Sequence, residues 1–463
     1  MANTVKAAHQ KELFGHPVGL YILFFTEMWE RFSYYGMRAI FVLYLTAKTV
    51  DENAGLGWSS GEALALYGWY TMLVYVASIP GGWIADKFLG QKKSVLVGGI
   101  LLVAGHSILA VEEMWAWYSG LGLIIAGVGM LKPNISTMVG GLYKQGDIRR
   151  DKGFTIFYIG INVGAFLSSL IVGYVGEVHG WHYGFGLAGI GMALGLLQYL
   201  LGQKYLADVG NFLGASEKEE DKEAMKKPLT KIEKDRIVVL FISFLLVIVF
   251  WGAFEQAGGL MNIYAKEKTN RMLMGWEVPA SWFQSLNAMF IIFLGTTIAW
   301  YWANRKLKGK VSSSLFKMIL GLIIMGTGFF FMTAASMEFN SDGSSAMYWL
   351  VLAYLFHTIG ELCISPVALS FITKLAPVKY GALMMGVYFA MTGFGNKLAG
   401  LLGESAENLG EFTIFTGIAV FCVIFGLLVM VFRKKLEVLT HGVEDKEGTL
   451  HEEAEGFELA DNS

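Results

Sequence analysis

Residues 27–38 read Glu-Met-Trp-Glu-Arg-Phe-Ser-Tyr-Tyr-Gly-Met-Arg, a charged stretch inside an apolar segment that runs from Val18 to Leu45. Charged side chains at membrane depth are costly, so they normally face a protein interior or a wet cavity and pair with one another. Steps of three, four and seven residues place the four charges on one face of a helix, namely Glu27, Glu30, Arg31 and Arg38. The stretch therefore predicts a membrane helix with an inward polar face.

The composition of the chain is that of a membrane protein. Apolar residues make up 54% of its 463 residues and charged residues 16%, whereas a soluble domain carries about 25% charged residues. A helix needs about 20 apolar residues to cross a bilayer, and we place twelve such stretches at residues 18–47, 63–86, 93–111, 115–141, 153–176, 183–203, 236–264, 281–304, 313–335, 346–375, 380–403 and 410–432. They predict an all-α membrane protein made of two six-helix bundles, residues 1–203 and 236–435.

Polar segments lie between and after the two predicted bundles. Residues 204–235 are rich in charge and are expected to form a solvated linker, and the acidic tail 436–463 is expected to be disordered. Residues 1–17 lack the apolar core of a signal peptide.

Basic residues indicate the orientation of the chain in the membrane. Lys and Arg collect on the side of the linker, in segments 87–93, 144–152, 305–310, 374–379 and 433–435. The connections on the other side are acidic, apart from the basic segment 266–271. Because positive residues favour the cytoplasmic side of a membrane, both termini and the linker are predicted to be cytoplasmic.

Two six-helix halves joined by a cytoplasmic linker are the layout of the major facilitator superfamily, in which the halves rock around a site near the membrane midplane. Residues 82–93 read Gly-Trp-Ile-Ala-Asp-Lys-Phe-Leu-Gly-Gln-Lys-Lys and resemble the motif between helices 2 and 3 of that superfamily. This motif concerns conformational switching and does not identify a substrate.

The ionisable residues within the predicted spans include cations in one half and anions in the other. The N-terminal half contributes Arg31, Arg38 and Lys132, whereas the C-terminal half contributes Glu255 and Glu361. One interpretation is that they are structural ion pairs that fix helix packing. The other is that they line a cavity for a zwitterion, with cations for a carboxylate and an anion for an amine. A buried carboxylate whose partner moves away can also take up a proton, as proton-coupled symport requires.

Five segments together resemble one known family. Residues 27–36 follow the pattern Glu-x-x-Glu-Arg-Phe-x-Tyr-Tyr-Gly, which resembles the first-helix motif of the proton-dependent oligopeptide transporters, the POT or PTR family. Four further segments are similar to family signatures on helices 5, 7, 8 and 10, at residues 154–165, 250–256, 282–287 and 360–377. The similarity covers nearly the whole chain and implies proton-coupled uptake of di- and tripeptides by alternating access.

The resemblance implies roles for individual residues. It assigns proton coupling to Glu27, Glu30, Arg31 and Glu255. It assigns peptide binding to Arg31, Tyr34, Tyr35, Tyr75, Lys132, Asn162, Trp251, Asn287 and Glu361. Within this set, Arg31 and Lys132 would face the peptide carboxylate, Glu361 would hold the free amine, and the two amides would reach the peptide backbone. Arg38 and Glu255 would form a pair that closes the outward gate.

The sequence also departs from the family pattern. Tyr388 and Phe389 stand where a Trp is usual, so Tyr388 is expected to form a different pocket wall. Gly68 stands where animal members have a histidine, so proton coupling is expected to depend on carboxylates. His106 and His357 also fall within spans, and each is expected to be a packed, hydrogen-bonded core residue. The linker is too short and too charged for the two extra helices of many bacterial members.

Other functions fit the sequence less well. One alternative is a POT-family carrier of another small solute, such as nitrate, a glucoside or a peptide-like drug, and another is a membrane sensor. A nitrate carrier gains nothing from an amine-binding acid, and a sensor would need an output domain. The sequence carries no metal-ligand cluster, nucleophile elbow or Walker-A loop, so we expect neither an enzyme nor a metal or cofactor, and the proton gradient would supply the energy. The expected setting is a bacterial inner membrane. The expected partners are peptides, protons, lipid and peptide-like drugs, without nucleic acid, and the expected functional unit is a monomer.

Overall fold

The charged stretch of residues 27–38 lies inside one long helix, α1 (Val18–Thr46), as the sequence predicts. A computed structural model of the chain describes residues 11–144, 147, 149–207, 209–211, 228–377 and 381–443. Residues 212–227 of the predicted linker, residues 444–463 of the predicted tail and residues 1–10 lie outside the described residues.

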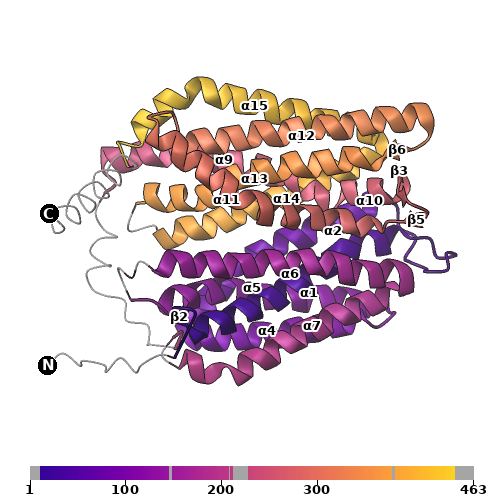
Figure 1. The fold of residues 1–463 in the computed structure, drawn as a ribbon, viewed down its shortest axis with the longest axis horizontal. Coiled ribbons are helices and arrows are strands. Elements are labelled where there is room, and N and C mark those ends of the chain that lie inside the picture. Colours follow the sequence, from indigo (N-terminus) through magenta and orange to yellow (C-terminus); the bar gives the residue numbers. More distant parts are fainter. Residues whose placement is uncertain are drawn as a thin grey trace.

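Six helical spans of the described chain form the N-terminal half (Figure 1). After α1 they are α2 (Ser60–Val76) with its continuations α3 (Ser78–Ile84) and η1 (Ala85–Leu89), then α4 (Gln91–Leu109), α5 (Met114–Gly141), α6 (Arg149–His179) and α7 (Trp181–Leu201). The short helix η2 (Gln203–Leu206) follows α7. Ahead of α1, strand β1 (Glu12–Leu13) pairs antiparallel with β2 (His16–Pro17).

The C-terminal half repeats this plan with six further spans of the described chain. They are α9 (Lys231–Phe254) with η3 (Glu255–Ala257) and α10 (Leu260–Glu267), η4 (Ala280–Gln284) with α11 (Ser285–Leu307), then α12 (Ser314–Asp342), α13 (Met347–Leu375), α14 (Gly381–Leu409) and α15 (Glu411–Leu439). Strand β3 (Thr269–Asn270) pairs parallel with β6 (Ser345–Ala346), and β4 (Met272–Leu273) pairs antiparallel with β5 (Trp276–Glu277).

Most of these spans are membrane helices by their composition alone. In the described chain, ten are long and apolar enough to cross a membrane. α1 and α14 are not among the ten, and α1 carries the four charges of residues 27–38. The predicted all-α membrane architecture of two six-helix bundles is therefore observed, and the two remaining spans are defined by their place in the bundle.

The limits of the C-terminal half differ from the predicted ones at both ends. α9 begins at Lys231, earlier than residue 236, because Thr230 and Glu233 form a capping box in which each side chain accepts a hydrogen bond from the backbone of the other residue. The last helix, α15, continues to Leu439, beyond residue 435. The Thr-x-x-Glu pattern at residues 230–233 is the sequence signal for this earlier start.

The first span of the C-terminal half is interrupted within the membrane region. α9 ends at Phe254, η3 follows, and the chain passes Gly258 and Gly259 before α10 begins. Gly259 has φ −103° and ψ −110°, far from helical geometry. Broken helices in transporters bring backbone groups and side chains to a central site, and here the break carries Glu255.

Hydrogen bonds join the two halves near one end of the bundle. Figure 1 places β2 and β5 at opposite ends, which we call the β2 end and the β5 end. Near the β5 end, Asn262 Nδ2 of α10 donates a hydrogen bond of 2.8 Å to the carbonyl oxygen of Ala39 in α1. Trp282 Nε1 of η4 donates one of 3.0 Å to the carbonyl oxygen of Leu170 in α6. These contacts hold the halves together beside the break in α9–α10.

Candidate functional site

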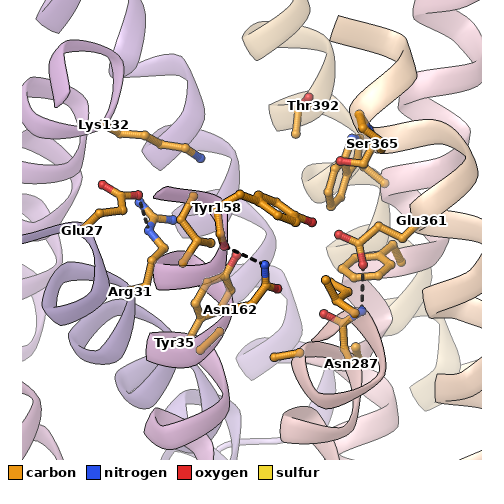
Figure 2. A pocket seen from close by; sticks show the side chains of 18 of the residues that line it. Glu27, Arg31, Tyr35, Lys132, Tyr158, Asn162, Asn287, Glu361, Ser365 and Thr392 are labelled. Carbon is orange, nitrogen blue, oxygen red and sulfur yellow. Dashed lines mark hydrogen bonds and ion pairs between the residues drawn. The ribbon is translucent and has the colours of Figure 1, made fainter. Parts of the chain in front are cut away.

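A cavity of about 600 Å³ lies between the two halves. Its lining comes from α1, α2, α5 and α6 on one side and from the α9–η3 segment, the η4–α11 segment, α13 and α14 on the other. Pockets for small ligands measure about 300–1,000 Å³, so the volume fits a small molecule. Figure 2 shows charged and amide side chains that project into the cavity from both sides.

Arg31 is held by two acidic residues of its own helix. Its Nε atom lies 3.0 Å from Oε1 of Glu27 and 2.5 Å from Oε2 of Glu30. Glu27 and Arg31 line the cavity, whereas Glu30 is fully buried outside the lining. Two carboxylates share one guanidinium, and Glu27 Oε2 and Glu30 Oε1 have no hydrogen-bond partner among the described residues. Because uncompensated buried charge is costly, the two carboxylates compete for this one guanidinium.

Lys132 of α5 is a cation for which the described chain shows a cation–π contact and no salt bridge. Its Nζ atom lies 3.8 Å from the ring centroid of Tyr75 on α2, which is a cation–π contact. Figure 2 shows the ammonium group pointing into the cavity on the same side as Arg31. Lys132 is therefore available to bind an anion there.

Glu361 of α13 supplies negative charge on the opposite side of the cavity (Figure 2). Asn287 Nδ2 of α11 donates a hydrogen bond of 2.7 Å to Glu361 Oε2 and one of 3.1 Å to Thr358 Oγ1. Glu361 is only 9% exposed. Because the cations belong to one half and this carboxylate to the other, the two walls are complementary in charge only when the halves face each other.

The predicted aromatic and amide residues share this cavity. Asn162 of α6 donates from Nδ2 to the carbonyl oxygen of Tyr158 at 2.9 Å, a bond that does not use its side-chain oxygen. Asn287 is engaged by Glu361. The aromatic residues predicted for the site that line the cavity are Tyr35, Tyr75, Trp251 and Tyr388. Their rings form an apolar surface between the charged walls.

Tyr34 differs from the other predicted binding residues. It is 4% exposed and does not belong to the described lining of the cavity. Its ring stacks on that of Tyr70, with 6.4 Å between the centroids. Successive residues of a helix point about 100° apart, so Tyr35 faces the cavity while Tyr34 faces the core of its own half. The direct peptide contact implied for Tyr34 does not agree with this position.

Arg38 and Glu255 form the predicted ion pair between the halves. Arg38 Nη1 lies 2.9 Å from Glu255 Oε1. The hydroxyl of Tyr67 on α2 donates a hydrogen bond of 2.5 Å to the same oxygen. Gln284 Oε1 accepts a longer bond of 3.5 Å from Arg38 Nη2. One carboxylate at the break of the α9–α10 span is therefore held by α1 and α2 of the opposite half.

The two membrane histidines lie in the core and outside the cavity lining. His106 and His357 are 0% and 1% exposed. The ring of His357 lies 4.4 Å from that of Phe329, centroid to centroid. The expected packing is observed, but the expected hydrogen bonds are not, because no ring nitrogen of either residue has a partner in the described chain.

Three tyrosines near the charged groups are not predicted by the sequence analysis. Tyr67, Tyr158 and Tyr354 surround the charged groups, and Tyr67 contacts Glu255 directly. Tyr67 and Tyr75 of α2 are eight residues apart, about 80° around the helix, and Tyr75 lines the cavity while Tyr67 does not. Tyr158 and Tyr354 follow apolar patterns that do not distinguish a cavity wall from a core.

The sequence matches one family over most of its length. Residues 92–215 and 211–412 match the family model PTR2, described as the POT family. The chain is 35% identical to the uncharacterized transporter YclF of Bacillus subtilis, over 95% of this chain and 98% of that protein. It is 35% identical to the peptide transporter YePEPT of Yersinia enterocolitica, over 85% and 88% of the two chains. It is 34% identical to a di-/tripeptide transporter of Lactococcus lactis subsp. cremoris, over 92% and 97%.

The fold is also shared with solved structures. A crystal structure of the peptide transporter POT in complex with sulfate superposes with a TM-score of 0.86 at 35% identity. The match covers 93% of this chain and 97% of that one. The similarity therefore extends to the whole two-bundle architecture and includes both walls of the cavity.

Proposed function

Because the chain belongs to the POT family, a family of transporters rather than enzymes, we propose that it takes up di- and tripeptides together with protons. It would do so by alternating access, in which the cavity opens to one side of the membrane at a time. The proposed location is a bacterial inner membrane with both termini in the cytoplasm, so that the β2 end faces inward and the β5 end outward.

The observation that carries this proposal is the opposed charge of the two cavity walls. Arg31 and Lys132 stand on one wall and Glu361 on the other (Figure 2). A peptide zwitterion carries a carboxylate and an ammonium group, so each terminus would meet a group of opposite charge in a site shielded from water. Recognition of the termini leaves the peptide side chains to the aromatic surface, which explains how one site accepts many sequences.

Proton coupling is proposed to use the carboxylates that share Arg31. Glu27 and Glu30 both contact its guanidinium, at 3.0 and 2.5 Å. When a peptide carboxylate approaches Arg31, three anions would compete for one cation. Uptake of a proton by Glu27 or Glu30 removes one of the three charges and lets the peptide bind. Peptide and proton would thus favour the same occupied state of the transporter.

The gate is proposed to depend on Arg38 and Glu255. Their ion pair, at 2.9 Å, joins the halves toward the β5 end. If Glu255 is protonated, the attraction to Arg38 weakens and the halves can separate there. No cofactor is proposed, since the proton gradient would supply the energy. A monomer would suffice because one chain supplies both walls, and peptide-like drugs with the same two termini would also fit.

The proposal is tested by uptake into proteoliposomes under an imposed pH gradient, with dialanine, trialanine and tetra-alanine as substrates. We expect dialanine and trialanine to accumulate above equilibrium and tetra-alanine to be a poor substrate. Accumulation should stop when a protonophore removes the gradient. Failure of all three peptides would favour the alternative of a POT-type carrier for another small solute, and the same vesicles would then be tested with nitrate and a glucoside.

A further inference from the structure

The side chain of Glu177 links the N-terminal half to a helical span of the C-terminal half. It lies near the end of α6, and its side chain is 3% exposed. Its carboxylate accepts hydrogen bonds from the backbone N–H of Ser281 at 2.8 Å and of Ala280 at 3.2 Å, the first residues of the η4–α11 span. Lys266 of α10 adds an ion pair at 3.3 Å. Glu177 therefore caps the N-terminus of a helical span that belongs to the other half.

Glu407 makes the reciprocal contact from the C-terminal half. It lies near the end of α14. Its Oε2 atom accepts a hydrogen bond of 2.9 Å from the backbone N–H of Gly61 and one of 3.2 Å from the hydroxyl of Ser59, at the start of α2. The Cβ atom of any larger residue at position 61 would lie 2.0 Å from this oxygen. Glycine at this position therefore leaves the space in which the carboxylate sits.

The two contacts occupy corresponding places in the two halves. α6 and α14 are each the fifth span of their half, and α2 and η4–α11 are each the second. In both cases the carboxylate binds the second N–H of the helix, that of Ser281 or Gly61. The structure thus contains an exchange, in which each half caps the second helical span of its partner half.

The properties of helix ends explain why these contacts are favourable and why they can be broken. The first N–H groups of a helix have no partner within the helix, and a carboxylate beside them is stabilised by the positive end of the helix dipole. Because each carboxylate belongs to the opposite half, the bonds exist only while the halves touch at the β5 end. When the halves separate there, water can hydrate both partners, so the bonds are reversible.

We propose that Glu177 and Glu407 form a pair of exchanged helix caps that hold the cavity closed at the β5 end and that must both be released for it to open there. This inference rests on the alternating access proposed above. It adds two gating residues to the pair Arg38 and Glu255, at positions that do not line the cavity. Glu177 stabilises the closed state more than Glu407 does. The Glu177 side chain is buried and also pairs with Lys266, whereas Glu407 is exposed.

The test measures the distance between the halves at the β5 end in lipid nanodiscs. Val50 and Met274 are 88% and 102% exposed and lie on loops of opposite halves, so Val50→Cys and Met274→Cys supply the two labels. The natural cysteines Cys363 and Cys422 are buried and would be replaced by Ala. Single-molecule fluorescence transfer then gives the ratio of open to closed molecules. If wild type is almost wholly closed, the comparison is made in an Arg38→Gln background.

Loss of a helix cap changes an equilibrium by about twofold to thirtyfold. We expect Glu177→Ala and Glu407→Ala each to raise the open-to-closed ratio within this range, Glu177→Ala by more. The two effects should multiply in the double variant, because the sites share no partner. Glu411→Gln is the matched control, because Glu411 pairs with Lys268 of its own half at 2.7 Å, and it should leave the ratio unchanged.

Gly61→Ala separates a gate from a purely local role in helix stability. Alanine favours a helix more than glycine does, so a local role predicts no loss of stability and no opening. The proposal predicts opening similar to that of Glu407→Ala, because the new methyl group displaces the carboxylate. Unchanged ratios in Glu177→Ala, Glu407→Ala and Gly61→Ala would overturn the proposal, whatever their melting temperatures.

The distance measurement needs no substrate and therefore stands apart from the transport assay. If wild-type vesicles accumulate peptide while the Ala variants keep the wild-type open-to-closed ratio, the proposal of exchanged caps is wrong and the proposed transport function is supported. If the Ala variants raise the open-to-closed ratio but no peptide accumulates in wild-type vesicles, the proposal of exchanged caps is supported and the proposed substrate is wrong.

Discussion

The Tyr67 hydroxyl donates a hydrogen bond of 2.5 Å to Oε1 of Glu255, the same oxygen that lies 2.9 Å from Arg38 Nη1. A tyrosine of α2 and an arginine of α1 thus hold the same oxygen of the carboxylate that is proposed to form the gate. Glu255 is 4% exposed, so each donor that it loses leaves a buried charge less compensated.

Tyr67→Phe is expected to favour opening at the β5 end. A hydrogen bond to a charged group contributes about 1.5–3 kcal/mol, so the open-to-closed ratio should rise by about tenfold or more. Single-molecule fluorescence transfer between labels at positions 50 and 274 measures this ratio. Tyr354→Phe is the control, because its hydroxyl donates to Ala257 of its own half at 3.2 Å. An equal change in both variants would contradict a specific role for Tyr67.

Glu361→Gln is expected to weaken binding of peptides that have a free amine. The variant removes the negative charge of that cavity wall but keeps the shape of the side chain. Affinity for dialanine should fall by about tenfold to a hundredfold, as for loss of a bond to a charged group. N-acetylated dialanine, which has no ammonium group, should lose far less. Competition binding to purified protein measures both, and equal losses would remove the amine-binding role.

Lys132→Gln is expected to weaken recognition of the peptide carboxylate. Lys132 forms no salt bridge in the described chain, so its charge is available to the ligand. Dialanine should lose affinity, whereas dialanine amide, which lacks the carboxylate, should lose little. Lys397→Gln is the matched control, because Lys397 lies outside the cavity lining, with its Nζ atom 4.5 Å from the ring centroid of Trp69. A similar loss for both ligands in Lys132→Gln would refute this role.

Glu27→Gln and Glu30→Gln are expected to separate peptide movement from proton movement. Each removes a carboxylate that competes for Arg31. Uptake driven by a pH gradient should be abolished, while exchange of labelled for unlabelled peptide across the membrane should remain. Both assays use the same vesicles. If the two variants still concentrate peptide against its gradient, proton coupling lies elsewhere.

The loop before α6 is expected to play no part in the pH dependence of transport. Arg149 donates side-chain and backbone hydrogen bonds to Asp147 and holds the pKa of that carboxyl below its ordinary value. A lowered pKa means that the contact is complete above the ordinary value and is lost only as pH falls through the lowered one. Asp147→Asn should therefore leave the shape of the uptake profile unchanged between about pH 5 and pH 8. A shifted profile would contradict this.

Much of the fold could be predicted because membrane helices are local. The bilayer demands long apolar segments, and their number and order are readable from residues 18–432. Helix ends and breaks were less predictable. The start at Lys231 depends on the capping box of Thr230 and Glu233, and the break after Glu255 depends on how Gly258 and Gly259 pack between the halves. Glycine is compatible with a continuous helix and with a broken one, so its presence alone does not predict the break.

The site was predictable where a charged side chain stands inside an apolar span. Arg31, Lys132 and Glu361 are charges within apolar spans, and all three line the cavity. Tyr34 and Tyr35 are adjacent tyrosines with the same chemistry, and only helix rotation separates the one in the core from the one in the cavity. Glu177 and Glu407 belong to the acidic segments on the side opposite the linker, and the sequence does not distinguish them from their acidic neighbours.

The sequence by itself determined that this protein is a membrane bundle of two similar halves with charges of opposite sign within them. Apolar length and the cost of charge in lipid are properties of each segment and need no partner. Only the tertiary structure decided which of those charges face each other, and that Glu177 and Glu407 cap helices of the opposite half. Such contacts join residues more than 100 positions apart, such as Glu177 with Ser281, because the distance between their atoms depends on how the two halves are packed together.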